Sequence, residues 1–178
     1  MILKYFELNK LNFTNTKFLL LHGKNEGYKK EEIGKISERL KRKIISYDEK
    51  QIIDNTVEFF ENNLNKSLFD NEKIIVINRC TDKITVVIEE LITKNIDDTL
   101  FILNSEALEK KSKLRNFFEK SKAGLVSIAF YPDNFDTLFK IAQRSLKEKK
   151  ILISSECVSI LINKCANDRK NLLNEIEK

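Results

Sequence analysis

Four short apolar runs, three of them continuous and the fourth interrupted by one serine, constrain the fold of this chain more than any other feature. They lie at residues 18–21 (FLLL), 74–77 (IIVI), 100–103 (LFIL) and 125–130 (LVSIAF). Strands that are apolar on both sides are typical of a parallel sheet that helices cover on both faces. Because helically spaced apolar residues fill the intervening segments, right-handed crossovers predict a three-layer α/β sandwich.

Helices are predicted between these strands wherever apolar residues recur three or four positions apart. Their stripes consist of Ile33, Ile36, Leu40 and Ile44; of Ile53, Val57, Phe60 and Leu64; of Ile84, Val87, Ile88 and Leu91; and of Leu114, Phe117 and Phe118. Asp82 precedes the third stripe and is predicted to cap that helix, because aspartate accepts hydrogen bonds from the free amides of a first turn.

The pattern changes at Pro132, after which only helices are predicted. Their apolar stripes consist of Phe135, Leu138, Phe139, Ala142 and Leu146; of Val158, Leu161, Ile162 and Cys165; and of Leu172, Leu173 and Ile176. Residues 1–132 are therefore expected to form the α/β domain, and residues 133–178 a small helical domain. The last helix reaches Lys178 without a C-cap signal, so we expect the chain to be a fragment of a longer protein.

Composition narrows the classes of protein to consider. No apolar run is long enough to span a bilayer, and the N-terminus lacks the apolar block of a signal peptide, so we expect a cytoplasmic protein without membrane contact. The three cysteines have no CxxC spacing and His22 is the only histidine, which predicts no metal site. The net charge of +5 is compatible with nearby nucleic acid but does not demonstrate contact with it.

The turn after the first apolar run occupies the place of a phosphate-binding loop, but its sequence is degenerate. A phosphate loop has the pattern GxxxxGK[ST], in which the lysine and the hydroxyl contact phosphate and magnesium. Here Gly23, Lys24 and Gly27 remain of the loop, Tyr28 stands at the lysine position and Lys29 at the hydroxyl position. Since no acidic pair follows residues 74–77, we predict no nucleotide binding and no catalytic residue, and an ATPase is the disfavoured alternative.

Two further segments are candidates for binding. The sequence Ser67-Leu68-Phe69 places two large apolar residues between a helix and a strand, where loops are usually polar. From the residues alone, packing of this pair under the sheet edge is favoured over presentation to a partner. The densest basic cluster consists of Lys110, Lys111, Lys113 and Arg115, and is the candidate for contact with DNA.

In this order, these segments resemble the delta subunit of bacterial DNA polymerase III. The resemblance comprises the strand–Gly–helix opening at residues 18–26, the Ser-Leu-Phe segment before a strand, and the basic passage 110–115 after another strand. It continues through the turn Tyr131-Pro132 to the ending N-E-I-E-K at residues 174–178. Phe139 departs from it, because many relatives have tryptophan there, and the collar domain of the family is absent beyond Lys178.

The resemblance implies an AAA+-like α/β domain with a degenerate nucleotide site, followed by a helical lid. It implies a clamp-loader subunit that binds and opens the beta sliding clamp during DNA replication, with no intrinsic enzyme activity and no cofactor. Leu68 and Phe69 would enter a hydrophobic pocket of the clamp, helped by Ser67, Phe60 and Leu64. The other implied partners are the gamma/tau and delta prime subunits and, through the complex, primed DNA. An AAA+ ATPase and a basic DNA-binding module remain the alternatives.

Overall fold

The computed structural model describes residues 1–64, 72–94, 96, 98–120 and 124–178 of the chain. These residues divide into two compact units. Unit 1 consists of residues 1–23 and 33–129, and unit 2 consists of residues 24–32 and 130–178. The sequence-based division at residue 132 does not anticipate that residues 24–32 group with the C-terminal helices.

Unit 1 is built on a six-stranded, all-parallel sheet with the strand order β1-β6-β2-β5-β4-β3. The strands are β1 (Ile2–Lys4), β2 (Phe18–His22), β3 (Lys43–Asp48), β4 (Lys73–Asn78), β5 (Thr99–Ser105) and β6 (Leu125–Ala129). The four apolar runs of the sequence form β2, β4, β5 and β6, and their central residues are buried. The predicted parallel α/β fold is therefore confirmed.

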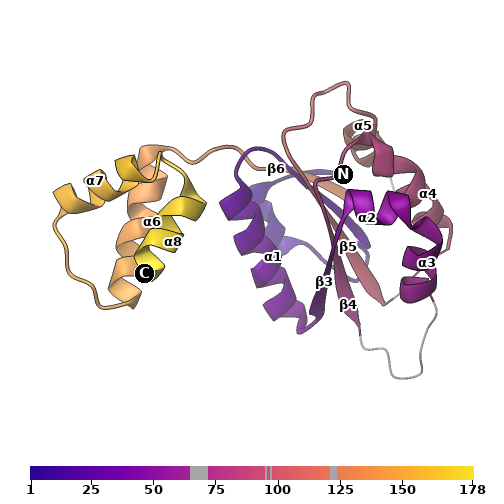
Figure 1. Ribbon diagram of the computed structural model, residues 1–178, viewed down its shortest axis with the longest axis horizontal. Coiled ribbons are helices and arrows are strands. Elements are labelled where there is room, and N and C mark those ends of the chain that lie inside the picture. The colour runs from indigo at the N-terminus through magenta and orange to yellow at the C-terminus, as the bar shows by residue number, and fades with distance from the viewer. Residues whose placement is uncertain (65–71, 95, 97, 121–123) are drawn as a thin grey trace. The chain divides into compact units, whose positions relative to one another are not determined.

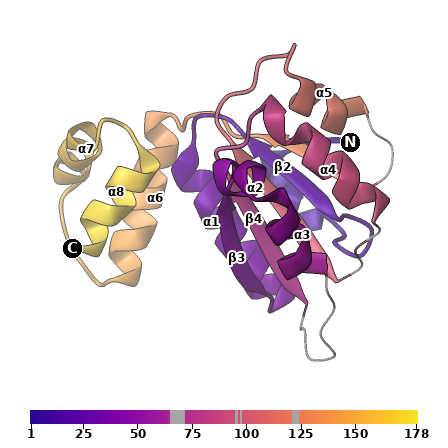
Figure 2. The same cartoon turned by 45° about the vertical axis from the view of Figure 1, so that its right-hand side comes forward.

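Helices cover both faces of this sheet. They are η1 (Tyr5–Lys10), α1 (Glu26–Leu40), α2 (Glu49–Asp54), α3 (Thr56–Leu64), η2 (Asp82–Ile84), α4 (Thr85–Thr93) and α5 (Lys113–Lys120). Within unit 1, residues 33–40 of α1 lie on one face, and α2 to α5 lie on the other (Figures 1 and 2). The change of face follows from the strand order, because the direction of travel along the sheet reverses at β3 and right-handed crossovers then use the opposite side.

The predicted stripe of the first helix is correct only as far as Leu40. Ile44 belongs to β3, the sheet's edge strand, and is 38% exposed. The helix ends in a Schellman motif, in which the amides of Lys41 and Arg42 donate to the carbonyls of Glu38 and Ser37. Lys41 occupies the left-handed position of this motif with φ 54°, where glycine is the usual residue. No glycine therefore marks the end of this helix in the sequence.

The prediction of the second helix is wrong in two respects: the segment is not one continuous helix, and it buries different side chains. The segment forms two helices, α2 and α3, which are separated at Asn55 (φ −136°). The break shifts the buried side chains to Ile52 and Phe59, whereas Ile53 is 39% and Val57 72% exposed. An apolar stripe that was expected to face the core therefore faces outward in part.

Asp82 caps a different helix from the one predicted. Its carboxylate accepts hydrogen bonds from the Leu114 amide (3.0 Å) and the Ser112 hydroxyl (2.6 Å), at the start of α5. These hydrogen bonds hold the pKa of the Asp82 carboxyl below its ordinary value, because they favour its charged form. The turn before α4 is instead capped by Thr81, whose hydroxyl accepts from the Lys83 amide.

Unit 2 contains the helices α6 (Phe135–Glu148), α7 (Ser155–Lys164) and α8 (Arg169–Glu177). Each begins at a side-chain cap, provided by Asn134, Ser154 and Asp168 respectively. Their buried side chains form one cluster that contains most of the predicted apolar stripes: Leu138, Ala142, Leu146, Val158, Ile162, Cys165, Leu172 and Ile176. Phe135 was also predicted on the stripe of α6, but it is 41% exposed in the structure. Among the residues that the structure describes, no helix is long and apolar enough to cross a membrane.

Candidate functional site

The residues that correspond to a phosphate loop begin directly after β2. Gly23 has φ 126°, and its amide donates to the Glu106 carbonyl at 3.2 Å. Asn25 then caps α1, because its side-chain oxygen accepts from the Tyr28 amide at 3.1 Å. In a phosphate loop, the free amides at this helix end bind the anion. Here a side chain of the protein itself satisfies one of them.

Gly27 permits the close approach of a helix rather than of a phosphate group. A Cβ atom at this position would lie 2.8 Å from the backbone nitrogen of Lys170 and 3.1 Å from its Cβ. Residue 170 belongs to the first turn of α8, so the backbone of α8 fills the space that a side chain at position 27 would need. Both residues belong to unit 2, and this contact needs no ligand.

The basic residue Lys29 is completely buried, with 0% relative exposure. Its ammonium group forms an ion pair with the Glu26 carboxylate, one turn earlier on α1. Burial of a charge is costly unless the charge is paired. This lysine is therefore part of the packed interior, whereas Lys24, the other candidate cation of the loop, is exposed.

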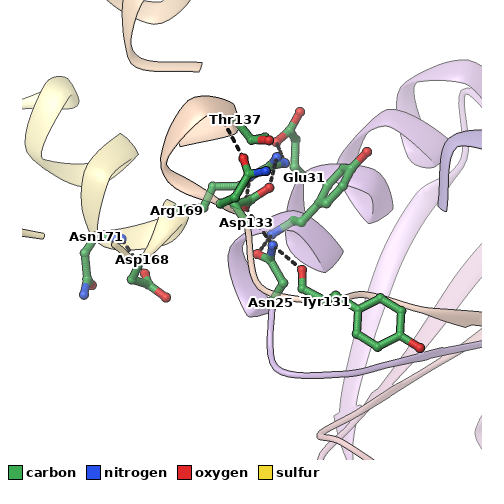
Figure 3. Close-up of polar contacts among 10 residues, drawn as sticks. Asn25, Glu31, Tyr131, Asp133, Thr137, Asp168, Arg169 and Asn171 are labelled. Carbon is green, nitrogen blue, oxygen red and sulfur yellow. Dashed lines mark hydrogen bonds and ion pairs between the residues drawn. The ribbon is translucent and has the colours of Figure 1, made fainter. Parts of the chain in front are cut away.

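Arg169 of α8 forms the centre of a buried polar cluster in unit 2 (Figure 3). Its guanidinium group donates to both carboxylate oxygens of Asp133, at 2.8 and 2.9 Å, and to Glu31 of α1 at 2.9 Å. The same group lies 3.9 Å from the centre of the Tyr28 ring. Arg169 is 6% exposed and Asp133 is 8% exposed, so these charges are paired away from solvent.

Asn25 joins the loop to this cluster. Its side-chain amide donates to Asp133 at 2.7 Å and to the Tyr131 carbonyl at 3.0 Å (Figure 3). The start of α1 is thus tied to the segment before α6 and, through Asp133, to α8. No sequence signal singled out Arg169 or Asp133, because one basic and one acidic residue at helix starts are ordinary surface positions.

Substitution of Gly27 tests this packing, and Gly34 of the same helix provides a matched control. We expect Gly27→Ala to lower the free energy of unfolding by about 1–3 kcal/mol, because the backbone of residue 170 cannot yield to the new methyl group. A methyl group at position 34 would meet no atom within 4 Å, so Gly34→Ala should stabilise α1 by about 0.5–1 kcal/mol. Urea unfolding followed by circular dichroism checks both values. Equal effects of the two substitutions would contradict the close approach of α8.

The end of β3 and the helices α2 and α3 line a hollow of about 540 Å³ in unit 1, together with Arg79, which directly follows β4. The Arg79 guanidinium pairs there with the Asp48 carboxylate, and residue 79 has φ 57°. Asn78 and Asn104 lie side by side at the ends of β4 and β5, with 3.3 Å between the Asn104 amide and the Asn78 oxygen. The strand β4 thus ends in an amide and a guanidinium, where a magnesium-dependent ATPase has carboxylates.

The predicted partner-binding residues fall at and beyond the end of α3. Ser67, Leu68 and Phe69 lie outside the described residues, and Leu64 is the last residue of α3. Phe60 is half-buried against the core of unit 1, and the Lys94 ammonium lies 5.0 Å from the centre of its ring. The outward apolar residues of this region are therefore Ile53 and Val57, which had been expected in the core.

The basic cluster is partly neutralised by acidic neighbours. Lys111 pairs with Glu109 at 2.9 Å, and Arg115 pairs with Glu119 at 2.7 Å. Arg115 also donates to the Leu108 carbonyl, so its guanidinium is engaged at the start of α5. Lys110 and Lys113 are exposed. The cluster as a whole thus presents less net charge to a nucleic acid than its sequence indicates.

Comparison with known proteins supports the fold alone. No family model and no curated protein matches this chain. Among solved structures, it is similar to the clamp loader delta protein YqeN of Bacillus subtilis, with a TM-score of 0.56 and 14% identity over 97% of this chain and 55% of that one. It is also similar to the RuvB branch migration motor of Thermotoga maritima, with a TM-score of 0.58 and 13% identity over 96% and 56% of the two chains.

A third similar structure is domain III of the replication initiation protein DnaA of Thermotoga maritima. Its TM-score is 0.55, with 16% identity over 97% of this chain and 78% of that one. The present chain spans little more than half the length of the clamp loader delta and RuvB chains. The chain therefore has the α/β, P-loop-like fold that these AAA+ proteins share.

Proposed function

We propose that this chain is a delta-type clamp-loader subunit, which binds the beta sliding clamp and favours an opened ring during DNA replication. The observation that carries the proposal is the outward apolar face of α2 and α3, where Ile53 and Val57 are 39% and 72% exposed. In the sequence, the last residue of α3 stands three positions before Ser67-Leu68-Phe69, the segment that resembles the clamp-binding motif of the delta family. The structural similarity to a clamp loader delta protein agrees with this proposal.

The energetics of such a contact are favourable. Burial of a large apolar side chain stabilises a complex by about 1.5–3 kcal/mol, so a few such residues form an effective hot spot. Opening of the ring then requires only that the subunit binds the open clamp more tightly than the closed clamp. No nucleotide chemistry in this chain is needed for that step. The proposal places the chain in the cytoplasm, together with the gamma/tau and delta prime subunits.

A matched pair of valines tests the role of the α2–α3 face. Val57 of α3 is 72% exposed and Val86 of α4 is 71% exposed, so an aspartate should be tolerated structurally at both positions. With the purified beta clamp of the same organism, we expect Val57→Asp to raise the Kd at least about tenfold, because a charge would be buried in an apolar contact. Val86→Asp should leave the Kd unchanged. Equal effects at the two positions, or no binding by the wild type, would overturn the proposal.

We further propose that the chain neither binds nor hydrolyses ATP. The support comes from the contacts around Gly27 and Lys29, since α8 packs against the first and the second is buried in an ion pair. Calorimetry with Mg-ATP should therefore detect no heat of binding at micromolar to millimolar nucleotide. Saturable micromolar binding would instead favour an AAA+ ATPase. A DNA-binding module is less well supported, because Lys111 and Arg115 pair with acidic side chains.

A further inference from the structure

The loop between α6 and α7 presents three consecutive aliphatic residues at the surface of unit 2. Ile151, Leu152 and Ile153 are 41%, 96% and 43% exposed, respectively. Large apolar side chains in a row at a surface are unusual, since loops of this length are normally polar. The three residues differ in their contacts.

Ile151 is explained by the end of α6. The amides of Lys150 and Ile151 donate to the carbonyls of Lys147 and Leu146, at 3.0 and 2.9 Å, which is the hydrogen-bond pattern of a Schellman motif. In this motif the residue at the Ile151 position commonly makes an apolar contact with the residue at the Leu146 position. Both residues line the same surface hollow of about 380 Å³.

Ile153 is explained by the start of α7. Ser154 is the N-cap, and its hydroxyl accepts from the Cys157 amide at 3.2 Å. A residue directly before an N-cap often packs against the fourth helical residue, an arrangement called the hydrophobic staple. Ile153 and Val158 occupy these two positions and line the same hollow as Ile151.

Leu152 has no such structural role. Its side chain is 96% exposed, between two residues that the capping motifs hold in place. The two flanking motifs fix the backbone of the loop, so little conformational entropy would be lost when a partner covers this side chain. Leu152 therefore has the properties of a preorganised anchor beside a shallow hollow.

The charge around this anchor is positive. Lys147, Lys149 and Lys150 are exposed at the end of α6, and Lys147 and Lys150 line the hollow with Leu152. The acidic residues beside this loop are Glu148, which is 3.9 Å from the Arg144 guanidinium, and the exposed Glu156 in the first turn of α7, so the lysines outnumber them. A partner that matches this surface would therefore present apolar atoms to Leu152 and carboxylates to the surrounding lysines.

We propose that the α6–α7 loop is a docking surface for a protein whose apolar pocket, rimmed by acidic side chains, receives Leu152. A lipid bilayer is a poorer fit, because even a single myristoyl chain, which is far more apolar than one leucine, gives only marginal membrane binding. Nucleic acid would use the lysines but not the exposed leucine. The proposal is independent of clamp binding by α2 and α3, and involves a different unit of the chain.

Photo-crosslinking identifies the partner and tests the proposal. A photoreactive phenylalanine analogue replaces Leu152 in the full-length protein in its own cells, and replaces the exposed Asn174 of α8 as the control. The protein that crosslinks at position 152 is then purified, and its Kd is measured with wild type, Leu152→Asp and the double variant Lys147→Glu/Lys149→Glu. Ile160→Asp serves as the matched binding control, because Ile160 of α7 is also exposed, at 57%.

We expect one protein to crosslink at position 152 and not at position 174. Its Kd should rise at least about tenfold with Leu152→Asp and with the charge-reversal pair, and change less than about twofold with Ile160→Asp. No crosslinked protein at position 152, or an unchanged Kd for Leu152→Asp, would overturn the proposal. The proposal would also be overturned if Leu152→Asp abolished binding to anionic phospholipid vesicles or duplex DNA but left protein binding intact.

Discussion

Replacement of Arg169 by methionine is expected to lower the stability of unit 2 by about 3–5 kcal/mol, the usual cost when one partner of a buried ion pair is removed. Asp133, whose side chain is 8% exposed beside Arg169, would lose both hydrogen bonds from the guanidinium group and keep the Asn25 amide as its partner in the cluster of Figure 3. Glu31 would lose its hydrogen bond to α8 at the same time. Methionine keeps much of the aliphatic volume, so the loss reports mainly on the charge.

Hydrogen exchange of the α6–α8 amides measures this loss locally, and urea unfolding measures it globally. The matched control is Arg144→Met on α6, where an arginine that is 66% exposed lies 3.9 Å from Glu148. Such a surface pair contributes at most about 1 kcal/mol. The double variant Arg169→Met/Asp133→Asn should be less destabilised than the sum of its single changes, because the orphaned charge is removed. Equal costs for Arg169→Met and Arg144→Met would show that the cluster does not hold unit 2 together.

The central strands were predictable because a strand that is buried on both sides requires a run of consecutive apolar residues. β2, β4 and β5 are central strands of a parallel sheet, and both sides of each must be apolar. The helices of unit 2 were predictable in a similar way, from the apolar stripes whose residues form most of their shared core. Edge strands carry a weaker signal, and β1 and β3, with exposed residues such as Ile2 and Ile44, were missed.

The missed end of α1 and the missed break between α2 and α3 have different physical causes. This chain has only four glycines, and it uses Lys41, Lys150, Ala166 and Asn167 at left-handed backbone positions where helices terminate. Without glycine as a marker, the apolar stripe of α1 seemed to continue into β3. In α2 and α3 the break at Asn55 rotated the helical face, so Val57 became an exposed residue rather than a core residue.

The polar cluster of unit 2 could not be predicted from the sequence. Arg169 and Glu31 are 138 residues apart, and their pairing depends on how α8 packs against α1. The departure of residues 23–29 from the phosphate-loop pattern is visible in the sequence, but the role of Gly27 is not, because a glycine in a sequence does not reveal which backbone approaches it. The Arg169 cluster and the contact at Gly27 therefore depend on long-range packing, which local sequence patterns do not encode.

Clamp binding should depend most strongly on Leu68 and Phe69 if the proposed function is correct. Truncation of a hot-spot side chain typically costs about 2 kcal/mol or more, so the double variant Leu68→Ala/Phe69→Ala should raise the Kd for the beta clamp by at least about 100-fold. This effect should exceed that of Val57→Asp, since the proposal assigns the anchors to residues 68 and 69 and a supporting contact to α3. Val86→Ala, at a position that is 71% exposed, is the control for unspecific effects.

The Kd for purified beta clamp, compared between wild type and Leu68→Ala/Phe69→Ala, tests the proposed function most directly. We predict measurable binding by the wild type, the same affinity for Val86→Ala, and a loss of at least about 100-fold for the double variant. Equal affinities of the wild type and the double variant, or no binding by either, would contradict the assignment of this chain as a clamp-binding subunit.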